Sequence, residues 1–299
     1  MSSPQLPSPL PDAEHLGGAF FFTLLMSLVV TWVAKRGGFY RLPPKKSPHP
    51  LPLWQTVGVF ATFLLISYLL LPLFALALAY FKTGSIIAIS SFSKVWLGWI
   101  QVTAFFILLV ALLFYCKCLK KEDALEVFWG GKRKQYLSTA FKDIGFGAMT
   151  WLVSYPIVVT TSLLAGFVSF QLWGVRGIEQ LAVKQLLKFL DEPFLFACLA
   201  LSVVLIVPFM EELLFRGFFQ TWLKRFVGRG WSVAITSLLF ACVHFAPSQK
   251  TGNFELILSL FVLSCYLGFI YERQRTIWAP VGLHLTFNGI TIIGLLFTQ

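Results

Sequence analysis

Long runs of apolar residues without charge constrain this chain more than any other feature of its sequence. Several of these runs reach the roughly 20 residues that an α-helix needs to cross a bilayer; Leu53–Phe81 and Val95–Cys116 are two examples. Only 12% of the 299 residues are charged, whereas soluble domains carry about a quarter. Because backbone polar groups in lipid must be bonded within their own segment, such runs form helices. The sequence therefore predicts an all-α fold, a polytopic integral membrane helix bundle.

We expect about eight transmembrane helices within one membrane domain. The expected spans are Leu16–Ala34, Leu53–Phe81, Val95–Cys116, Ile144–Leu172, Ala200–Phe219, Trp231–Phe245, Leu256–Tyr271 and Ile277–Phe297. Residues 1–15 are predicted to be a disordered tail, because the first eleven are rich in Ser and Pro. Residues 16–193 then form the N-terminal transmembrane helices together with an interfacial segment, and residues 194–299 form the C-terminal helices.

Two stretches between the spans are predicted to be helices outside the hydrocarbon. Leu119–Tyr136 mixes acidic and basic residues, which favours a surface helix. Trp173–Glu192 places apolar residues at helical spacing, which is typical of an amphipathic helix lying in the membrane interface.

The positive charge of the chain is distributed unevenly along these spans. The net charge is +11, and most Lys and Arg residues fall in alternate loops or at the membrane edges beside them. The opposite side keeps only Lys82, Lys94, Arg176, Lys184, Lys188 and Lys250. This asymmetry predicts that the basic loops are cytoplasmic and that both termini are non-cytoplasmic. The charge then indicates contact with anionic lipids and argues against a nucleic-acid partner.

Two adjacent glutamates, Glu211 and Glu212, interrupt the most apolar part of the chain. A charged residue at the middle of a bilayer costs about 2.5–3.5 kcal/mol on insertion scales, which makes intramembrane charges candidates for function. Arg216 lies four residues after Glu212, so the two share a helix face and can pair. Glu211 points about 100° away and is left free. An ion pair with a purely structural role explains Glu212 and Arg216 equally well, but it does not explain Glu211.

Two further motifs place histidines on late spans at helical spacing. Phe240 and His244 are four residues apart, and so are His284 and Asn288. A single histidine in an apolar helix is more often a packing residue. Two histidines together with Asn288 and the acidic pair make independent packing roles less plausible. Pro208 and Pro280 lie close to these motifs and predict local kinks.

The three motifs together resemble the CPBP family of intramembrane proteases, which includes the type II CAAX prenyl endopeptidases and the bacterial Abi-type and bacteriocin-processing proteins. The motifs read EELLFR, FACVH and HLTFN and follow the order of the family. The resemblance extends over roughly Phe194–Phe297. It implies that Glu211 and His244 hold and activate a water molecule, and that His284 and Asn288 donate to the oxyanion. Glu212, Arg216 and Phe240 would support them.

Cofactor use stays open at this point. Glu211, His244 and His284 make a plausible zinc set by residue type, although the H-E-x-x-H pattern of many zinc proteases is absent. Asn288 fits a hydrogen-bond donor better than a zinc ligand, which favours hydrolysis without a cofactor.

The resemblance implies that the substrate is a membrane-associated peptide or lipidated protein, cut near its terminus. A proton-coupled transporter and a non-catalytic immunity or scaffold protein of the same fold are the alternatives. The short loops favour a bacterial inner membrane.

Overall fold

The described residues of this computed structural model, 13–44, 49–84, 93–131, 137–174 and 185–297, form helices joined by turns, with no β-strand among them. The first half of the chain contributes α1 (Ala13–Arg36), α2 (Leu53–Leu65), α3 (Leu71–Thr83), α4 (Lys94–Lys117), α5 (Lys121–Trp129) and α6 (Leu137–Trp173). The second half contributes α8 (Pro193–Leu201), α9 (Val207–Glu212), α10 (Thr221–Cys242), α11 (Gly252–Gln274) and α12 (Trp278–Phe297). The connecting segments are π-helical at η1 (Ile66–Leu70), η3 (Ser202–Ile206) and η4 (Leu213–Gln220), and 3-10 helical at η5 (Pro247–Gln249). The predicted all-α fold is confirmed.

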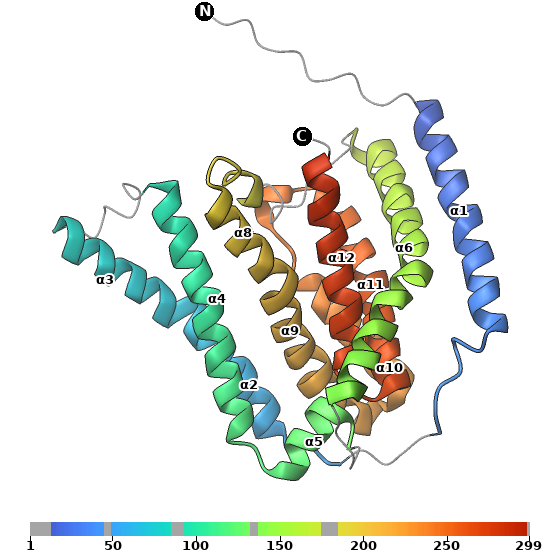
Figure 1. The fold of residues 1–299 in the computed structure, drawn as a ribbon. Coiled ribbons are helices and arrows are strands. Elements are labelled where there is room, and N and C mark those ends of the chain that lie inside the picture. The colour runs from blue at the N-terminus through green and yellow to red at the C-terminus, as the bar shows by residue number, and fades with distance from the viewer. Residues whose placement is uncertain (1–12, 45–48, 85–92, 132–136, 175–184, 298–299) are drawn as a thin grey trace, which may run out of the picture.

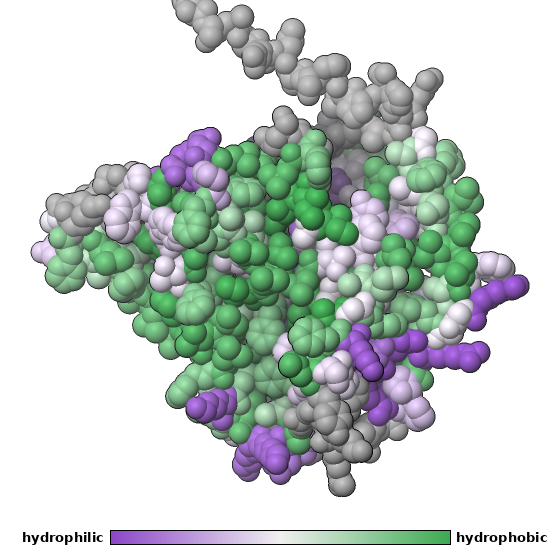
Figure 2. Space-filling model, in the orientation of Figure 1, coloured by the Kyte–Doolittle hydropathy of each residue, from purple (hydrophilic) through white to green (hydrophobic). Residues whose placement is uncertain are grey.

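Seven helical runs in the described part of the chain are long and apolar enough to cross a membrane. One of them, Pro193–Cys242, is 50 residues long and contains the fifth predicted span and most of the sixth, while each of the others matches one predicted span. Gly228 breaks this long run with φ 76° and ψ 175°, a conformation that glycine adopts without a steric penalty. Apolar side chains cover most of the visible face of the molecule (Figure 2). The protein is an integral membrane protein.

The later helices form the centre of the bundle, and the earlier ones lie around them. Helix α6 packs against α1, α11 and α12, and α10 packs against α11. Helices α2, α3 and α4 lie on the side of α8 and α9 that faces away from α6 and α12 (Figure 1). The beginning of α1 and the end of α12 lie at the same end of the bundle (Figure 1). The basic ends of α1, α4 and α11 lie at the other end, and which end faces the cytoplasm stays a prediction.

Helices α6 and α12 approach each other closely through two glycines. A Cβ atom added to Gly147 would lie 2.8 Å from the backbone nitrogen of Leu283, and one added to Gly282 would lie 2.8 Å from Cα of Ile144. Ordinary carbon contacts begin at about 3.4 Å, so neither position accepts a side chain without movement. Small residues allow this approach, as they do in other membrane helix pairs. The contact fixes the depth and rotation of the first turns of α12, which carry His284.

The two predicted proline kinks have different outcomes. Pro208 is the second residue of α9, which directly follows the π-helical segment η3, so the helix is irregular next to the proline, as the sequence predicted. Pro280 lies in the first turn of α12 instead. Proline is tolerated there because the first N–H groups of a helix have no intrahelical acceptor. The prediction of a kink at Pro280 was therefore wrong.

The stretch Leu119–Tyr136 does contain a helix, α5, and one face of this helix is buried. Asp123, Glu126 and Val127 are buried. The Asp123 carboxylate lies 2.9 Å from Nε2 of His49 and accepts a hydrogen bond of 2.7 Å from Nε2 of Gln55. Asp123 and Glu126 therefore face the interior, and α5 covers the end of the bundle although its sequence mixes acidic and basic residues.

Two other predictions fall largely outside the described residues. Of the predicted tail, residues 1–12 are not described, and α1 already begins at Ala13. Of the predicted interfacial helix, residues 175–184 are not described. The part that follows packs inward, with Leu186 buried against Leu195 and Leu199.

Candidate active site

Glu212 and Arg216 form a fully buried ion pair. Helix α9 ends at Glu212, and the π-helical segment η4 begins at the next residue. Nη1 of Arg216 donates to Oε1 of Glu212 at 2.9 Å, and neither side chain is exposed. The pairing predicted from the four-residue spacing is therefore confirmed. Burial of both charges is tolerable only with further hydrogen bonds, which other helices provide.

Ser264 on α11 and Phe240 on α10 complete the surroundings of Arg216. Nη2 of Arg216 donates to Oγ of Ser264 at 2.6 Å and to its carbonyl oxygen at 3.2 Å. The guanidinium carbon lies 4.8 Å from the centre of the Phe240 ring, within the range of a cation–π contact. Sequence reasoning missed Ser264, because a serine in an apolar helix carries no signal of its own.

Glu211 faces both predicted histidines. Its carboxylate oxygens lie 3.7 Å from Nε2 of His244 and 3.6 Å from Nε2 of His284. The Glu211 side chain is 22% exposed, whereas that of Glu212 is completely buried. The two neighbouring carboxylates therefore differ in access: only Glu211 can be reached from outside the protein interior.

The hydrogen bonds of the two histidines fix which ring nitrogen faces Glu211. Nδ1 of His244 lies 2.7 Å from the carbonyl oxygen of Phe240, and Nδ1 of His284 lies 2.8 Å from Oε1 of Glu212. A carbonyl or carboxylate oxygen can only accept, so each Nδ1 carries a proton. Each Nε2 therefore points at Glu211. In a neutral ring this atom offers a lone pair.

Phe240 contributes its ring as well as its carbonyl oxygen. The ring centroid lies 4.7 Å from that of His244 and 5.9 Å from that of His284. Both imidazoles are thus held against one aromatic surface. This arrangement gives a physical reason for the Phe240–His244 spacing noted in the sequence.

Asn288 lies one turn beyond His284 on α12 and contacts a different part of the bundle. Its Nδ2 donates to the carbonyl oxygen of Val203 at 2.9 Å, within the π-helical segment η3. Among the described residues Asn288 makes no hydrogen bond to Glu211 or to either histidine. One of the two amide hydrogens stays available for another acceptor.

The residues at Glu211 fit a metal ion by type but not by arrangement. Two imidazoles and a carboxylate are common zinc ligands, and metal-binding histidines usually donate from their other nitrogen, as both do here. Among the described residues, however, no group of three or more His, Cys, Asp or Glu side chains is placed to hold a metal ion. Hydrolysis without a cofactor stays the prediction, and zinc held by Glu211, His244 and His284 stays its alternative.

Comparison with known proteins assigns a family to this part of the chain. Residues 193–290 match the family model described as type II CAAX prenyl endopeptidase Rce1-like. The matched range includes every residue of the candidate site, from Glu211 to Asn288. Neither the curated proteins nor the solved structures contain a match. Residues 193–290 are therefore similar to the Rce1-like type II CAAX prenyl endopeptidase family, which confirms the resemblance predicted from the three motifs.

Proposed function

We propose that this protein is an intramembrane endopeptidase that hydrolyses a peptide bond near the terminus of a membrane-associated or lipidated protein. The family supports a CAAX-type membrane protease. The proposal adds a mechanism, in which Glu211 activates a water molecule without a cofactor.

The convergence of three groups on one point carries this proposal. The Glu211 carboxylate lies 3.6–3.7 Å from Nε2 of both histidines, slightly beyond direct hydrogen-bond distance. A water molecule that donates one hydrogen to Glu211 and the other to the lone pair of His244 fits these groups. Both imidazoles are oriented in advance by acceptors at Nδ1, so the site does not need to reorganise when the substrate binds.

In the first step, Glu211 takes a proton from this water while its oxygen attacks the carbonyl carbon of the substrate. The carbonyl π electrons move to oxygen, and a tetrahedral oxyanion forms. In the second step the C–N bond breaks, the carbonyl re-forms, and the proton held by Glu211 passes to the leaving nitrogen. The products are a carboxylic acid and an amine.

His284 and Asn288 are proposed to donate to the oxyanion. Because Nδ1–H of His284 is already given to Glu212, donation from Nε2 requires a second proton on the ring. That proton would lie on Nε2, which faces Glu211 at 3.6 Å.

The family further suggests a prenylated protein as the substrate. We propose entry from the cytoplasmic side or laterally between helices, because Lys224 and Arg229 mark the basic end of the bundle. The same basic end would contact anionic lipids. We retain a bacterial inner membrane and non-cytoplasmic termini as parts of this proposal.

The test is cleavage of lipidated C-terminal peptides by purified protein in liposomes. Glu211→Gln, His244→Ala and His284→Ala should each lose about a hundredfold or more in kcat, the usual range for a general base or an oxyanion donor. Glu255→Gln and His49→Ala are matched controls, because Glu255 binds Ser162 and His49 binds Asp123, away from the site. Equal rates for the parent and all three site variants would refute the assignment.

The same liposomes separate the alternative functions. A proton-coupled transporter would acidify or alkalinise the lumen when substrate is added, and Glu211→Gln would abolish this flux without any cleavage in the parent. An immunity or scaffold protein would bind the peptide and leave it intact. Cleavage that depends on Glu211, without such flux, supports the protease.

A further inference from the structure

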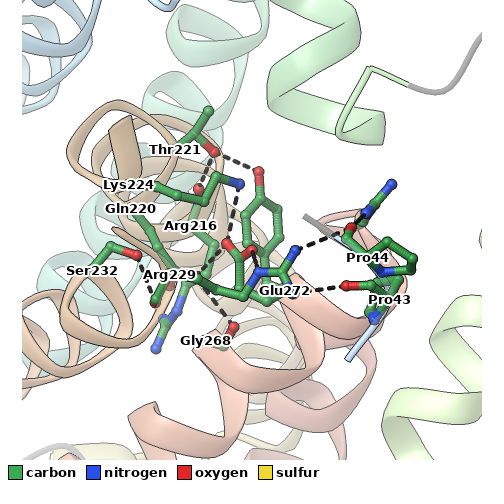
Figure 3. A network of polar contacts seen from close by, with 12 residues as sticks. Pro43, Pro44, Arg216, Gln220, Thr221, Lys224, Arg229, Ser232, Gly268 and Glu272 are labelled. Atoms are coloured by element: carbon green, nitrogen blue, oxygen red, sulfur yellow. Dashed lines mark hydrogen bonds and ion pairs between the residues drawn. The ribbon is translucent and has the colours of Figure 1, made fainter. Parts of the chain in front are cut away.

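A ladder of polar contacts continues from the candidate site to the basic end of the bundle. Four side chains occur at four-residue intervals on one continuous run: Glu212, Arg216, Gln220 and Lys224. Their partners, Ser264, Gly268 and Glu272, repeat at the same interval on α11. Figure 3 shows the part of the ladder between Arg216 and the loop that follows α1.

The rungs of the ladder are hydrogen bonds from side chains of one run to groups of α11. The first joins Arg216 to Ser264, as described for the site. In the second, Nε2 of Gln220 donates to the carbonyl oxygen of Gly268 at 3.2 Å and to Oε1 of Glu272 at 3.1 Å. In the third, Nζ of Lys224 lies 3.1 Å from the same Glu272 oxygen. Two segments far apart in sequence are thereby held in one register.

The basic end of the ladder, at Glu272, is bonded to the loop that follows α1. Nε of Arg229 lies 3.2 Å from Oε2 of Glu272, and its Nη1 donates to the carbonyl oxygen of Pro43 at 2.9 Å. Arg275 donates to the carbonyl oxygen of Pro44. The loop after α1 is therefore attached to the network that begins at Glu272.

The π-helical segment η4 is what keeps the row on one face. Four residues exceed one turn of an α-helix by about 40°, so a row at this spacing drifts around a regular helix. The π-helix bonds each residue to the fifth along and has more residues per turn. Since η4 spans Leu213–Gln220, it reduces the drift where Arg216 and Gln220 must both face α11.

Burial makes the middle rung sensitive to change. Gln220 and Ser264 are completely buried, and Glu272 is 3% exposed. Oε1 of Gln220 has no hydrogen-bond partner among the described residues, so the side chain is held by its amide nitrogen alone. Loss of that amide removes both bonds of Gln220 to α11, one turn from Arg216.

We propose that Gln220 and Glu272 are positioning residues for the reaction. They fix the register of η4 against α11, so that Arg216 holds Glu212 and Glu212 holds the Nδ1–H of His284. Neither residue touches the substrate. The proposal rests on the function proposed above, but it also predicts a property of His284 that needs no substrate.

The experiment compares Gln220→Leu with Gln249→Leu, a buried glutamine outside the ladder. The first readout is proton exchange at Nδ1 of His284, followed by NMR of ¹⁵N-histidine-labelled protein, which has only four histidines to assign. We expect exchange at least about tenfold faster in Gln220→Leu. The second readout is kcat, which should fall by roughly 10- to 100-fold, in line with small misplacements of catalytic groups, with KM unchanged. Gln249→Leu should match the parent in both.

A folded Gln220→Leu protein with the exchange rate of the parent would overturn the proposal. If Gln220→Leu does not fold, proton exchange at His284 is measured instead in variants that swap the side chains of Gln220 and Glu272. Gln220→Glu alone places two carboxylates together, whereas Gln220→Glu with Glu272→Gln restores one amide and one carboxylate. Slower exchange in the double variant than in Gln220→Glu supports the ladder, and equal exchange refutes it. A parent that cleaves no peptide refutes the proposed function alone, because the exchange comparison still decides the role of Gln220.

Discussion

Replacement of Gly282 by alanine should damage the active site through the packing of two helices. The new Cβ would lie 2.8 Å from Cα of Ile144 on α6 and closer still to the Ile144 carbonyl oxygen. These are backbone atoms, so no side chain can turn aside. To restore an ordinary contact of 3.4 Å, α6 and α12 must separate by at least about 0.6 Å, and more to clear the oxygen.

This separation acts directly on His284, which follows Gly282 by two residues. Nδ1 of His284 lies 2.8 Å from Oε1 of Glu212. A shift of 0.6 Å along that line would either stretch the hydrogen bond to about 3.4 Å, near its limit, or force the two groups to overlap. We expect overpacking to cost about 1–3 kcal/mol of unfolding free energy. The misplaced imidazole should lower kcat by roughly 10- to 100-fold.

Gly294→Ala on the same helix is the matched control, because no atom lies within 4 Å of its added Cβ. Unfolding in mild detergent measures stability, and cleavage of a lipidated peptide in liposomes measures kcat. Gly294→Ala should leave both values near those of the parent. If Gly282→Ala and Gly294→Ala behave alike in both assays, the close contact of α6 and α12 does not position His284.

Further changes test other parts of the site. Arg216→Met should lower the unfolding free energy by about 3–5 kcal/mol, because it leaves the fully buried Glu212 charge without its partner. Ser264→Ala should cost less, about 1–3 kcal/mol, since only one acceptor of Arg216 is removed; a larger effect of Ser264→Ala would contradict this order. Asn288→Ala should lower kcat by roughly 10²–10³-fold if the amide donates to the oxyanion. It should cost only about 1 kcal/mol for the lost bond to Val203, and an unchanged kcat would exclude the donor role. Chelator-treated protein should keep its kcat, and loss of activity that returns with stoichiometric zinc would establish a metal enzyme.

The fold could be predicted well from the sequence because a bilayer imposes length and composition on each span. The exception is instructive: the fifth and sixth predicted spans lie on one helical run with a break at Gly228. The sequence around Gly228 and Gly230 looks like an ordinary loop, and only the backbone angles show that helix continues on both sides. Pro280 failed as a signal of a kink for a related reason, since the effect of proline depends on where its helix begins.

Contacts within one helix could be predicted from spacing at the site, whereas contacts between helices could not; the approach of Glu211 to His244 was expected only from the family resemblance. The pairing of Glu212 with Arg216 follows from a four-residue spacing. The partner of Arg216 on α11 is 48 residues away in sequence, and the acceptor for Asn288 is a backbone carbonyl 85 residues away. A carbonyl acceptor leaves no trace in the residue type. The roles of Ser264 and Val203 therefore become visible only when the helices are packed.

Glu211 and Glu212 also differ in their contacts with other helices. Adjacent residues on a helix point about 100° apart, so one carboxylate can lie inside the bundle while the other stays partly exposed. Glu212 receives donors from Arg216 and His284 at one oxygen, and its other oxygen has no partner among the described residues. The Glu212 carboxylate therefore binds both the Arg216 guanidinium and the His284 imidazole. Glu211 has no hydrogen bond of comparable length in the described chain and keeps its lone pairs for a proton. Because Arg216 balances the charge of Glu212 and no Lys or Arg pairs with Glu211 among the described residues, packing does not explain this second, partly exposed carboxylate, which supports the chemistry proposed for Glu211.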